Sequence, residues 1–263
     1  MNITLEQKIE PNKAYITGAS SGIGAAFAKK LAKDHDIVII ARDTERLNQL
    51  AEDIKKNSDS KVDIIEADLT KSTDLKKIVK MVTTDKNLSL LVNNAGYGTT
   101  GKFVDLKIDQ EINQINLNIV ALVRLTHAAL TNFKSKIGGA IINVASIAGF
   151  LPAPYNATYA ATKSFVRSFT EAIHKEYKDS GIVLQTLCPG FTKTEFQTRA
   201  NFDESKIPGF LWMDAADVVK ESLEALEREQ SICIPGLANK SLTTLLDVLP
   251  KNLVQQIADI MLK

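Results

Sequence analysis

Three side chains near the middle of the chain carry functional groups suited to proton transfer at a carbonyl oxygen. Tyr159 and Lys163 are four residues apart in a segment with helical periodicity, and side chains at this spacing share one face of a helix. A phenol has a pKa of about 10 in water, and a neighbouring cation lowers this pKa by favouring the phenolate. Ser146 follows the apolar run 140–145 and could bring a hydroxyl to the same place. A hydroxyl donor, a phenol and a cation together are suited to acid–base catalysis.

Tyr and Lys at this spacing also occur in proteins as a half-buried Tyr beside a solvated Lys. A glycine-rich turn earlier in the chain favours the catalytic interpretation, because it predicts a cofactor site. The turn 18–24 lies between a predicted strand, 13–17, and a helix that begins near residue 25. In a dinucleotide site, such glycines let the backbone approach a pyrophosphate at the helix N-terminus. The spacing is Gly-x-x-x-Gly-x-Gly, not the commoner Gly-x-Gly-x-x-Gly. A tight connection without a ligand is the alternative, but the flanking strand and helix favour phosphate binding.

The residues after the second predicted strand, 36–41, bear on the choice of cofactor. An acidic residue there would bind a free ribose 2′-hydroxyl, whereas an arginine accommodates a 2′-phosphate. This chain has Arg42, and Arg46 one helical turn later, which favours NADP(H) over NAD(H). The alternative is that Arg42 is a surface charge and that Asp43 is only a helix N-cap.

Further polar residues lie where later strands are predicted to end, the edge at which parallel sheets bind ligands. Asp68 could accept a hydrogen bond from an adenine amino group or cap the next helix. The stretch 93–96, Asn-Asn-Ala-Gly, could face a cofactor or form a turn stabilised by Asn side chains. Asn116 and Asn118 lie in an apolar helical pattern from about 109 to 133, and a buried amide there needs a partner. That partner could be the backbone or a water near the site.

Strands alternate with helices along the chain, which predicts an α/β fold with a doubly wound, Rossmann-type parallel sheet. We expect one NAD(P)-binding domain over 1–263, with a core of about 11–235 and a C-terminal helical extension of about 239–263. The extension is predicted as two amphipathic helices, 241–249 and 251–262. It could pack on its own domain, cover the substrate pocket or form a subunit contact.

The composition narrows the partners and the compartment. The net charge is +1, which indicates neither nucleic acid nor an anionic membrane as a partner. There is no apolar run of membrane-spanning length and no evident signal peptide. The two cysteines lie in apolar runs and are predicted to be free thiols, and the three histidines form no ligand motif, so we predict no metal site. We expect a cytoplasmic protein.

In their order and spacing these motifs resemble the short-chain dehydrogenase/reductase family, over about residues 11 to 195. The resemblance implies a sheet of about seven strands, usually in a homodimer or homotetramer. It also implies a catalytic set in which Tyr159 is the acid or base, Lys163 binds the nicotinamide ribose and lowers the Tyr159 pKa, Ser146 polarises the substrate carbonyl, and Asn116 holds a relay water. The implied cofactor-binding residues are Tyr159 and Lys163 together with Thr17, Gly18, Ser20, Ser21, Gly22, Ile23, Gly24, Arg42, Asp68, Leu69, Asn94, Ala95, Gly96, Pro189, Gly190 and Thr192.

The segment after the sixth predicted strand normally covers the substrate in this family. Here it is rich in aromatic and aliphatic residues between 191 and 213, and the loop 150–155 adds more, so we predict a largely apolar pocket. The function implied is NADP(H)-dependent hydride transfer to or from a hydrophobic carbonyl compound or secondary alcohol. The alternatives are a non-catalytic nucleotide sensor or scaffold on the same fold, and an NAD-dependent alcohol dehydrogenase.

Overall fold

A seven-stranded parallel sheet forms the centre of the molecule in the computed structural model, which describes residues 12–136, 138–200 and 207–248. The strand order is β3-β2-β1-β4-β5-β6-β9, so the direction of winding reverses between β1 and β4. The predicted doubly wound sheet is therefore confirmed. The strands are β1 (Lys13–Thr17), β2 (Asp36–Ala41), β3 (Val62–Glu66), β4 (Leu88–Asn93), β5 (Gly139–Val144), β6 (Ile182–Leu187) and β9 (Ile232–Cys233).

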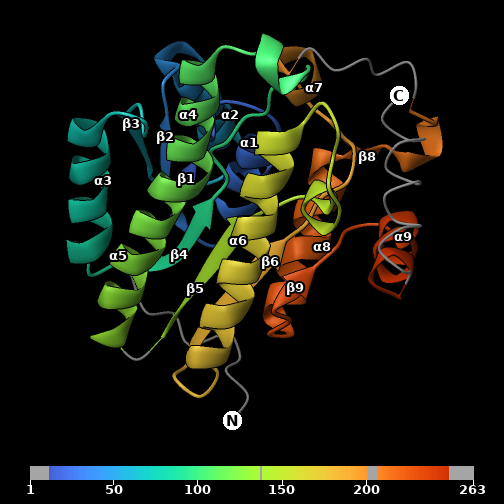
Figure 1. Cartoon of the computed structure of the whole chain (residues 1–263). Coiled ribbons are helices and arrows are strands. Elements are labelled where there is room, and N and C mark those ends of the chain that lie inside the picture. The colour runs from blue at the N-terminus through green and yellow to red at the C-terminus, as the bar shows by residue number, and fades with distance from the viewer. Residues whose placement is uncertain (1–11, 137, 201–206, 249–263) are drawn as a thin grey trace.

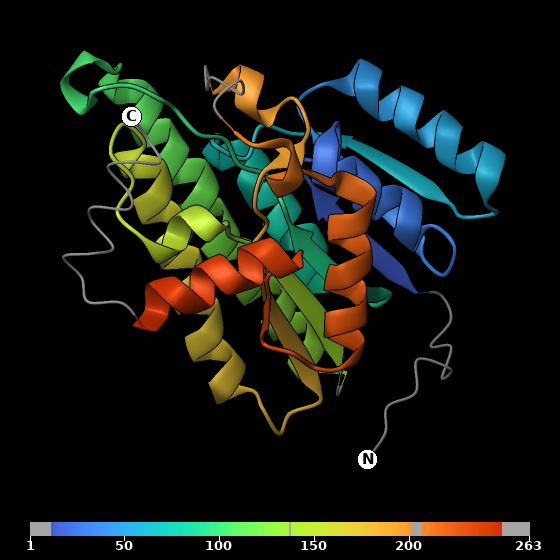
Figure 2. The same ribbon diagram turned by 90° about the vertical axis from the view of Figure 1, so that its right-hand side faces the viewer.

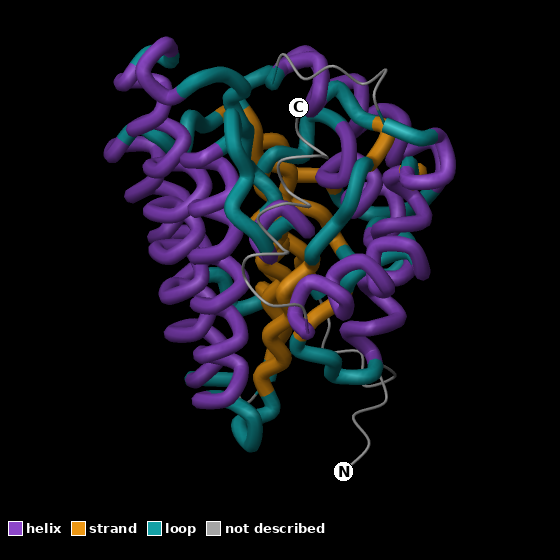
Figure 3. Tube along the Cα trace, turned by 45° about the vertical axis from the view of Figure 1, so that its right-hand side comes forward, coloured by secondary structure: helices purple, strands orange, loops and turns teal. Residues whose placement is uncertain are grey.

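Both faces of the sheet are buried, which explains why the central strands are apolar almost throughout. Along β2, Ile37 and Ile39 pack into one core, whereas Val38 and Ile40 pack into the other. The first core lies under α1 (Gly22–Leu31), α2 (Thr44–Asn57) and α8 (Ala215–Glu227), and the second under α3 (Ser72–Thr84), α5 (Leu122–Lys134) and α6 (Ala157–Glu176). Figures 1 and 3 show the strands as a layer between these two groups of helices.

The long helix predicted from about 109 to 133 is interrupted. It consists of α4 (Ile108–Ile115), a π-helical segment, η2 (Asn116–Ala121), and α5. A π-helical turn rotates the side chains that follow it relative to a regular α-helix, and such turns are frequent at functional sites.

The C-terminal part contains elements that the sequence patterns did not predict. A small parallel sheet pairs β7 (Thr192–Lys193) with β8 (Met213–Asp214), and α7 (Phe196–Arg199) follows β7. The predicted extension is present as α9 (Leu237–Val248), which crosses in front of the sheet in Figure 2 and packs on η3 (Ile147–Phe150). Two other short turns are η1 (Phe103–Asp105) and η5 (Gly209–Leu211).

The second helix predicted in the extension, 251–262, lies outside the described residues. Within the residues that are described, no helix is long and apolar enough to cross a membrane.

Candidate active site

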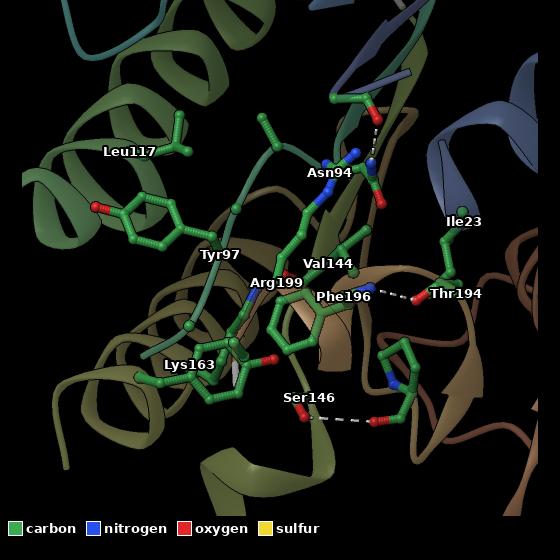
Figure 4. Close-up of a pocket in the computed structure, with 18 of the residues that line it drawn as sticks. Ile23, Asn94, Tyr97, Leu117, Val144, Ser146, Lys163, Thr194, Phe196 and Arg199 are labelled. Carbon is green, nitrogen blue, oxygen red and sulfur yellow. Dashed lines mark hydrogen bonds between the residues drawn. The ribbon is translucent and has the colours of Figure 1, made fainter. Parts of the chain in front are cut away.

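A cavity of about 1160 Å³ opens at the carboxyl edge of the sheet, on both sides of the point where the winding reverses. This is the edge at which open α/β sheets bind ligands. Most of the predicted site residues line the cavity, including Tyr159. Figure 4 shows two of the others, Ser146 and Lys163. Three do not line the cavity: Thr17, Gly24 and Asn116.

The three candidate catalytic side chains come from two consecutive elements. Ser146 follows β5 and begins η3, where its Oγ accepts the Ala148 N–H at 3.1 Å. Tyr159 and Lys163 lie in the first two turns of α6, on the face that points into the cavity. The Ser146 Oγ also donates to the Pro189 carbonyl at 3.5 Å, and its closeness to Tyr159 works to lower the Tyr159 pKa. The structure therefore brings the phenol and the hydroxyl into one site.

Burial decides the protonation of both ionisable groups. It raises the pKa of Tyr159 to about 12, and this effect outweighs the opposing influence of Ser146. It lowers the pKa of Lys163 to about 8, and the Lys163 Nζ donates to the Val144 carbonyl at 2.8 Å. The Nζ lies 5.7 Å from the centre of the Tyr159 ring.

The predicted lowering of the Tyr159 pKa by Lys163 is not seen in this structure, where burial raises that pKa and Ser146 is the group that works to lower it. A protonated Tyr159 at neutral pH is poised to act as an acid. Lys163 keeps its charge below about pH 8 and loses it as the pH rises through that value.

Asn118, not Asn116, is the amide that reaches the catalytic helix. The Asn118 Oδ1 accepts the Tyr97 N–H at 3.2 Å, and its Nδ2 donates to the Tyr97 carbonyl at 3.0 Å and to Thr162 Oγ1 at 3.1 Å. A Cβ on Gly96 would lie 3.0 Å from the Asn118 Oδ1 and 3.6 Å from the Lys163 Nζ. Gly96 therefore leaves room for the amide and the ammonium to approach each other.

The prediction that named Asn116 is corrected on this ground. Asn116 begins η2, is partly buried and makes no side-chain hydrogen bond within the described part of the chain. Asn118 is 2% exposed, two residues further into the π-helical segment. Both asparagines were visible in the sequence, and the signal that separates them is the π-helical geometry, which the apolar pattern does not reveal.

The glycine-rich turn forms a close-fitting cradle with the end of β4. Gly18 has a φ of +66°, and a Cβ there would lie 2.8 Å from the Ala95 Cα. At Gly24 a Cβ would lie 2.4 Å from the Gly18 carbonyl oxygen, so this glycine is required by packing rather than by contact with a ligand.

Thr17 and Asn94 fix the conformation of this cradle through side-chain hydrogen bonds to its backbone. The Thr17 Oγ1 accepts the N–H groups of Asn94 and Ala95, each at 3.0 Å. The Asn94 Nδ2 donates to the carbonyls of Thr17 and Gly18, at 3.0 and 3.1 Å. The bare backbone and the helix N-terminus together fit the pyrophosphate of a dinucleotide.

Charged residues lie at the far end of this cradle. Arg42 is exposed at the cavity wall and makes no ion pair with any residue that the structure describes. The pKa of Asp68 lies below its usual value. Burial of the carboxylate raises this pKa, but hydrogen bonds from Thr70 and the nearby charge of Arg42 lower it by more. The expected N-cap at Asp43 is confirmed, since its Oδ1 accepts the Arg46 N–H at 3.1 Å. The side chain of Arg46 is paired with Asp43 and Glu195.

The opposite end of the cavity is apolar. The Phe196 ring packs against the Tyr159 ring with 5.4 Å between centres, and Figure 4 shows Phe196 and Ser146 among the residues that line the cavity. Leu242 and Leu246 of α9 also line the cavity, and the sequence patterns had not distinguished them from the other leucines of the extension. Two basic residues of the neighbouring segment already have acidic partners: Lys193 is paired with Asp214 at 3.2 Å, and Arg199, which lines the cavity, is paired with Glu195.

Comparison with known proteins gives a consistent result. A family model described as short chain dehydrogenase matches residues 12–205. The mouse (Mus musculus) protein 17-beta-hydroxysteroid dehydrogenase type 3 is 32% identical over 244 residues, which cover 91% of this chain and 77% of that protein.

Two solved structures have similar folds and comparable identities. A short-chain dehydrogenase from Sphingobium yanoikuyae in complex with NADPH has a TM-score of 0.82 and 33% identity, covering 91% of this chain and 97% of that one. The bulky-bulky ketone specific alcohol dehydrogenase from Comamonas testosteroni has a TM-score of 0.78 and 30% identity, covering 91% and 95% of the two chains.

Proposed function

The chain belongs to the short-chain dehydrogenase family, and from this premise we propose that it is an NADP(H)-dependent oxidoreductase that reduces apolar ketones or aldehydes. One observation carries the proposal. A buried, protonated tyrosine lies beside Ser146, in the same cavity as a glycine cradle that fits a dinucleotide. A nucleotide sensor would need the cradle but would have no use for a buried acid beside it.

The proposed mechanism assigns the proton to the protein and the hydride to the cofactor. A bound nicotinamide cofactor supplies a hydride to the carbonyl carbon. Tyr159 donates its proton to the carbonyl oxygen, and its high pKa keeps the proton available at neutral pH. Ser146 orients the same oxygen through its hydroxyl. Tyr159 must regain a proton after each turnover. Lys163 and Asn118, whose polar atoms both lie beside Gly96, are the groups that would return it.

The preference for NADP(H) rests on Arg42. This guanidinium lines the cavity and has no ion-pair partner among the described residues, so it is available to a ribose 2′-phosphate. The NADPH named in the Sphingobium yanoikuyae structure agrees with this assignment. Reduction is the proposed direction, because cells usually keep this cofactor reduced and because Tyr159 is protonated.

The apolar end of the cavity supports a hydrophobic substrate. Phe196, Leu242 and Leu246 form its wall, and no unpaired cation lies there within the described residues to bind a carboxylate. The names of two similar proteins, a hydroxysteroid dehydrogenase and a bulky-ketone alcohol dehydrogenase, point to the same substrate class. A single domain and a homodimer or homotetramer in the cytoplasm stay predictions from the sequence.

Calorimetry with NADPH and NADH, followed by a panel of apolar ketones and aldehydes, tests the proposal. We expect tight NADPH binding, weaker NADH binding and turnover on part of the panel. Tyr159→Phe should leave NADPH affinity within about twofold and lower kcat by about 10³-fold or more, because the proton donor is lost. Wild-type protein that binds NADPH but reduces nothing, or a Tyr159→Phe variant with full activity, would contradict the catalytic assignment.

A further inference from the structure

A chain of ion pairs crosses the rim of the cavity from α2 to α7. The Arg46 Nε forms an ion pair with the Asp43 Oδ2 at 3.3 Å, and the Arg46 Nη1 donates to the Glu195 Oε2 at 2.6 Å. The Arg199 Nη2 donates to the same Glu195 oxygen, also at 2.6 Å. Asp43 and Arg199, the two ends of this chain, both line the cavity. Arg46 and Glu195, the two middle members, do not line the cavity themselves, but they join its cofactor end, at Arg42 and the glycine cradle, to the segment 194–199 beside its apolar substrate end.

Glu195 makes the two arginines at the cofactor end unequal. Arg42 has no carboxylate partner among the described residues, whereas Arg46 has two. The hydrogen bond between Arg46 and Glu195 raises the pKa of Arg46 and lowers that of Glu195, so both groups are charged at neutral pH. All members are substantially exposed, and exposed ion pairs are weak and screened by salt. A stronger anion could therefore displace Glu195.

The position of Glu195 also determines that of Phe196, the next residue. The Phe196 N–H donates to the Thr194 Oγ1 at 3.2 Å, and the Phe196 ring lies against Tyr159. A Cβ on Gly22 would lie 3.0 Å from the Thr194 methyl carbon, so the segment 194–196 is in contact with the glycine cradle as well. One short segment thus touches the phosphate-binding turn, the adenosine-side arginine and the catalytic tyrosine.

We propose that Glu195 is a cofactor-specificity residue whose carboxylate occupies the Arg46 guanidinium that a ribose 2′-phosphate would otherwise bind. The inference rests on the proposed function, because it assumes a 2′-phosphate beside Arg42. A phosphate has more charge than a carboxylate and matches the arginine fork, so it takes Arg46 from Glu195. The phosphate and the Glu195 carboxylate are both negative, so the bound phosphate repels Glu195. The movement of Glu195 away from Arg46 shifts Phe196, the next residue, relative to Tyr159. NAD(H) has no such phosphate and leaves the Arg46–Glu195 pair intact.

The test compares nucleotide affinities of the full chain and its Glu195→Gln variant by calorimetry. We expect the NADPH dissociation constant to fall about three- to tenfold in Glu195→Gln and the NADH constant to change less than twofold. The gain should disappear when Arg46→Gln is added. Asp214→Asn is the matched control, since it breaks the exposed Lys193–Asp214 pair of the same segment and should change neither affinity.

The single tryptophan provides a second readout that does not depend on turnover. Trp212 packs against Phe191 with 5.6 Å between ring centres, beside the segment that contains Glu195. Adenosine 2′,5′-bisphosphate should change the Trp212 emission of the wild type, and 5′-AMP should not. In Glu195→Gln the emission should already lie closer to the bisphosphate-bound value.

Several outcomes would separate the inference from the proposed function. Tight NADPH binding by the wild type with no gain in Glu195→Gln overturns the inference alone. Equal gains for NADPH and NADH also overturn it, because the effect would then not depend on the 2′-phosphate. A wild type that binds neither nucleotide overturns the proposed function and the inference together.

Discussion

The two ends of the cavity are built in different ways. At the cofactor end, the walls are mostly backbone, held in place by hydrogen bonds such as those that the Thr17 hydroxyl accepts from the N–H groups of Asn94 and Ala95. At the substrate end, the walls are side chains, with Phe196 in α7 and Leu246 in α9. A backbone cradle tolerates few residue types, because a Cβ at Gly18 or Gly24 would overlap its neighbours. A side-chain wall can change by substitution without disturbing the sheet.

The catalytic groups and the groups that select the ligands lie in different parts of the molecule. The acid, the hydroxyl and the cation are attached to β5 and α6, which belong to the rigid core. The groups that decide which cofactor and which substrate enter are on the rim and on the C-terminal elements. Substitutions in the core should therefore abolish catalysis with every substrate, whereas substitutions at either end should change preferences and leave the chemical step in place.

After the loss of the proton donor Tyr159, the largest expected effect concerns the two asparagines of η2. Asn118→Ala should lower kcat on the order of 10²-fold with NADPH affinity nearly unchanged, because the amide beside Lys163 is lost. Asn116→Ala is the matched control from the same segment and should keep activity within about twofold. Steady-state kinetics with one ketone and saturating NADPH provide the measurement. Equal losses in both variants would contradict the correction of Asn116 to Asn118.

The asparagines also mark the limit of what could be predicted. The glycine turn, Ser146 and the Tyr159–Lys163 pair were found from sequence because each depends on residues close together in the chain. The resemblance implied Asn116, whereas Asn118 is the amide that reaches α6, and the helical pattern in the sequence gives no sign of the π-helical segment that places it there. Leu246 could be placed on the apolar face of a helix, but not against the cavity, because helical periodicity does not say which element packs on that face.

An intermediate effect is expected at the cofactor end. Arg42→Asp should weaken NADPH binding and improve NADH binding, changing the ratio of the two affinities by about 30-fold, because an acidic side chain repels a 2′-phosphate and accepts from a 2′-hydroxyl. The measurement is calorimetry with both nucleotides. Lys102→Asp makes the same change of charge at an exposed residue outside the cavity and should leave the ratio unaltered. An unchanged ratio in Arg42→Asp would contradict the assignment of NADP(H).

The smallest expected effect concerns α9, where the leucines of one helix offer an internal control. The start of α9 is held in place, since the Glu221 carboxylate accepts the Gly236 N–H at 3.1 Å and pairs with Lys240 at 3.3 Å. Leu242 and Leu246 line the cavity, whereas Leu245 is 51% exposed on the other face. The helix is thus a fixed wall with one apolar face toward the substrate.

A series of aryl ketones with increasing alkyl length, from acetophenone to valerophenone, tests this wall. Leu242→Ala and Leu246→Ala should each lower kcat/KM for the longest ketone by about five- to tenfold, because apolar contact area is lost, and should change the value for acetophenone by less than twofold. Leu245→Ala should follow the wild type along the whole series. A uniform loss across the series in the Leu242 and Leu246 variants would mean that α9 supports the fold and does not select the substrate. The substrate end would then resemble the cofactor end, with its walls serving the structure first.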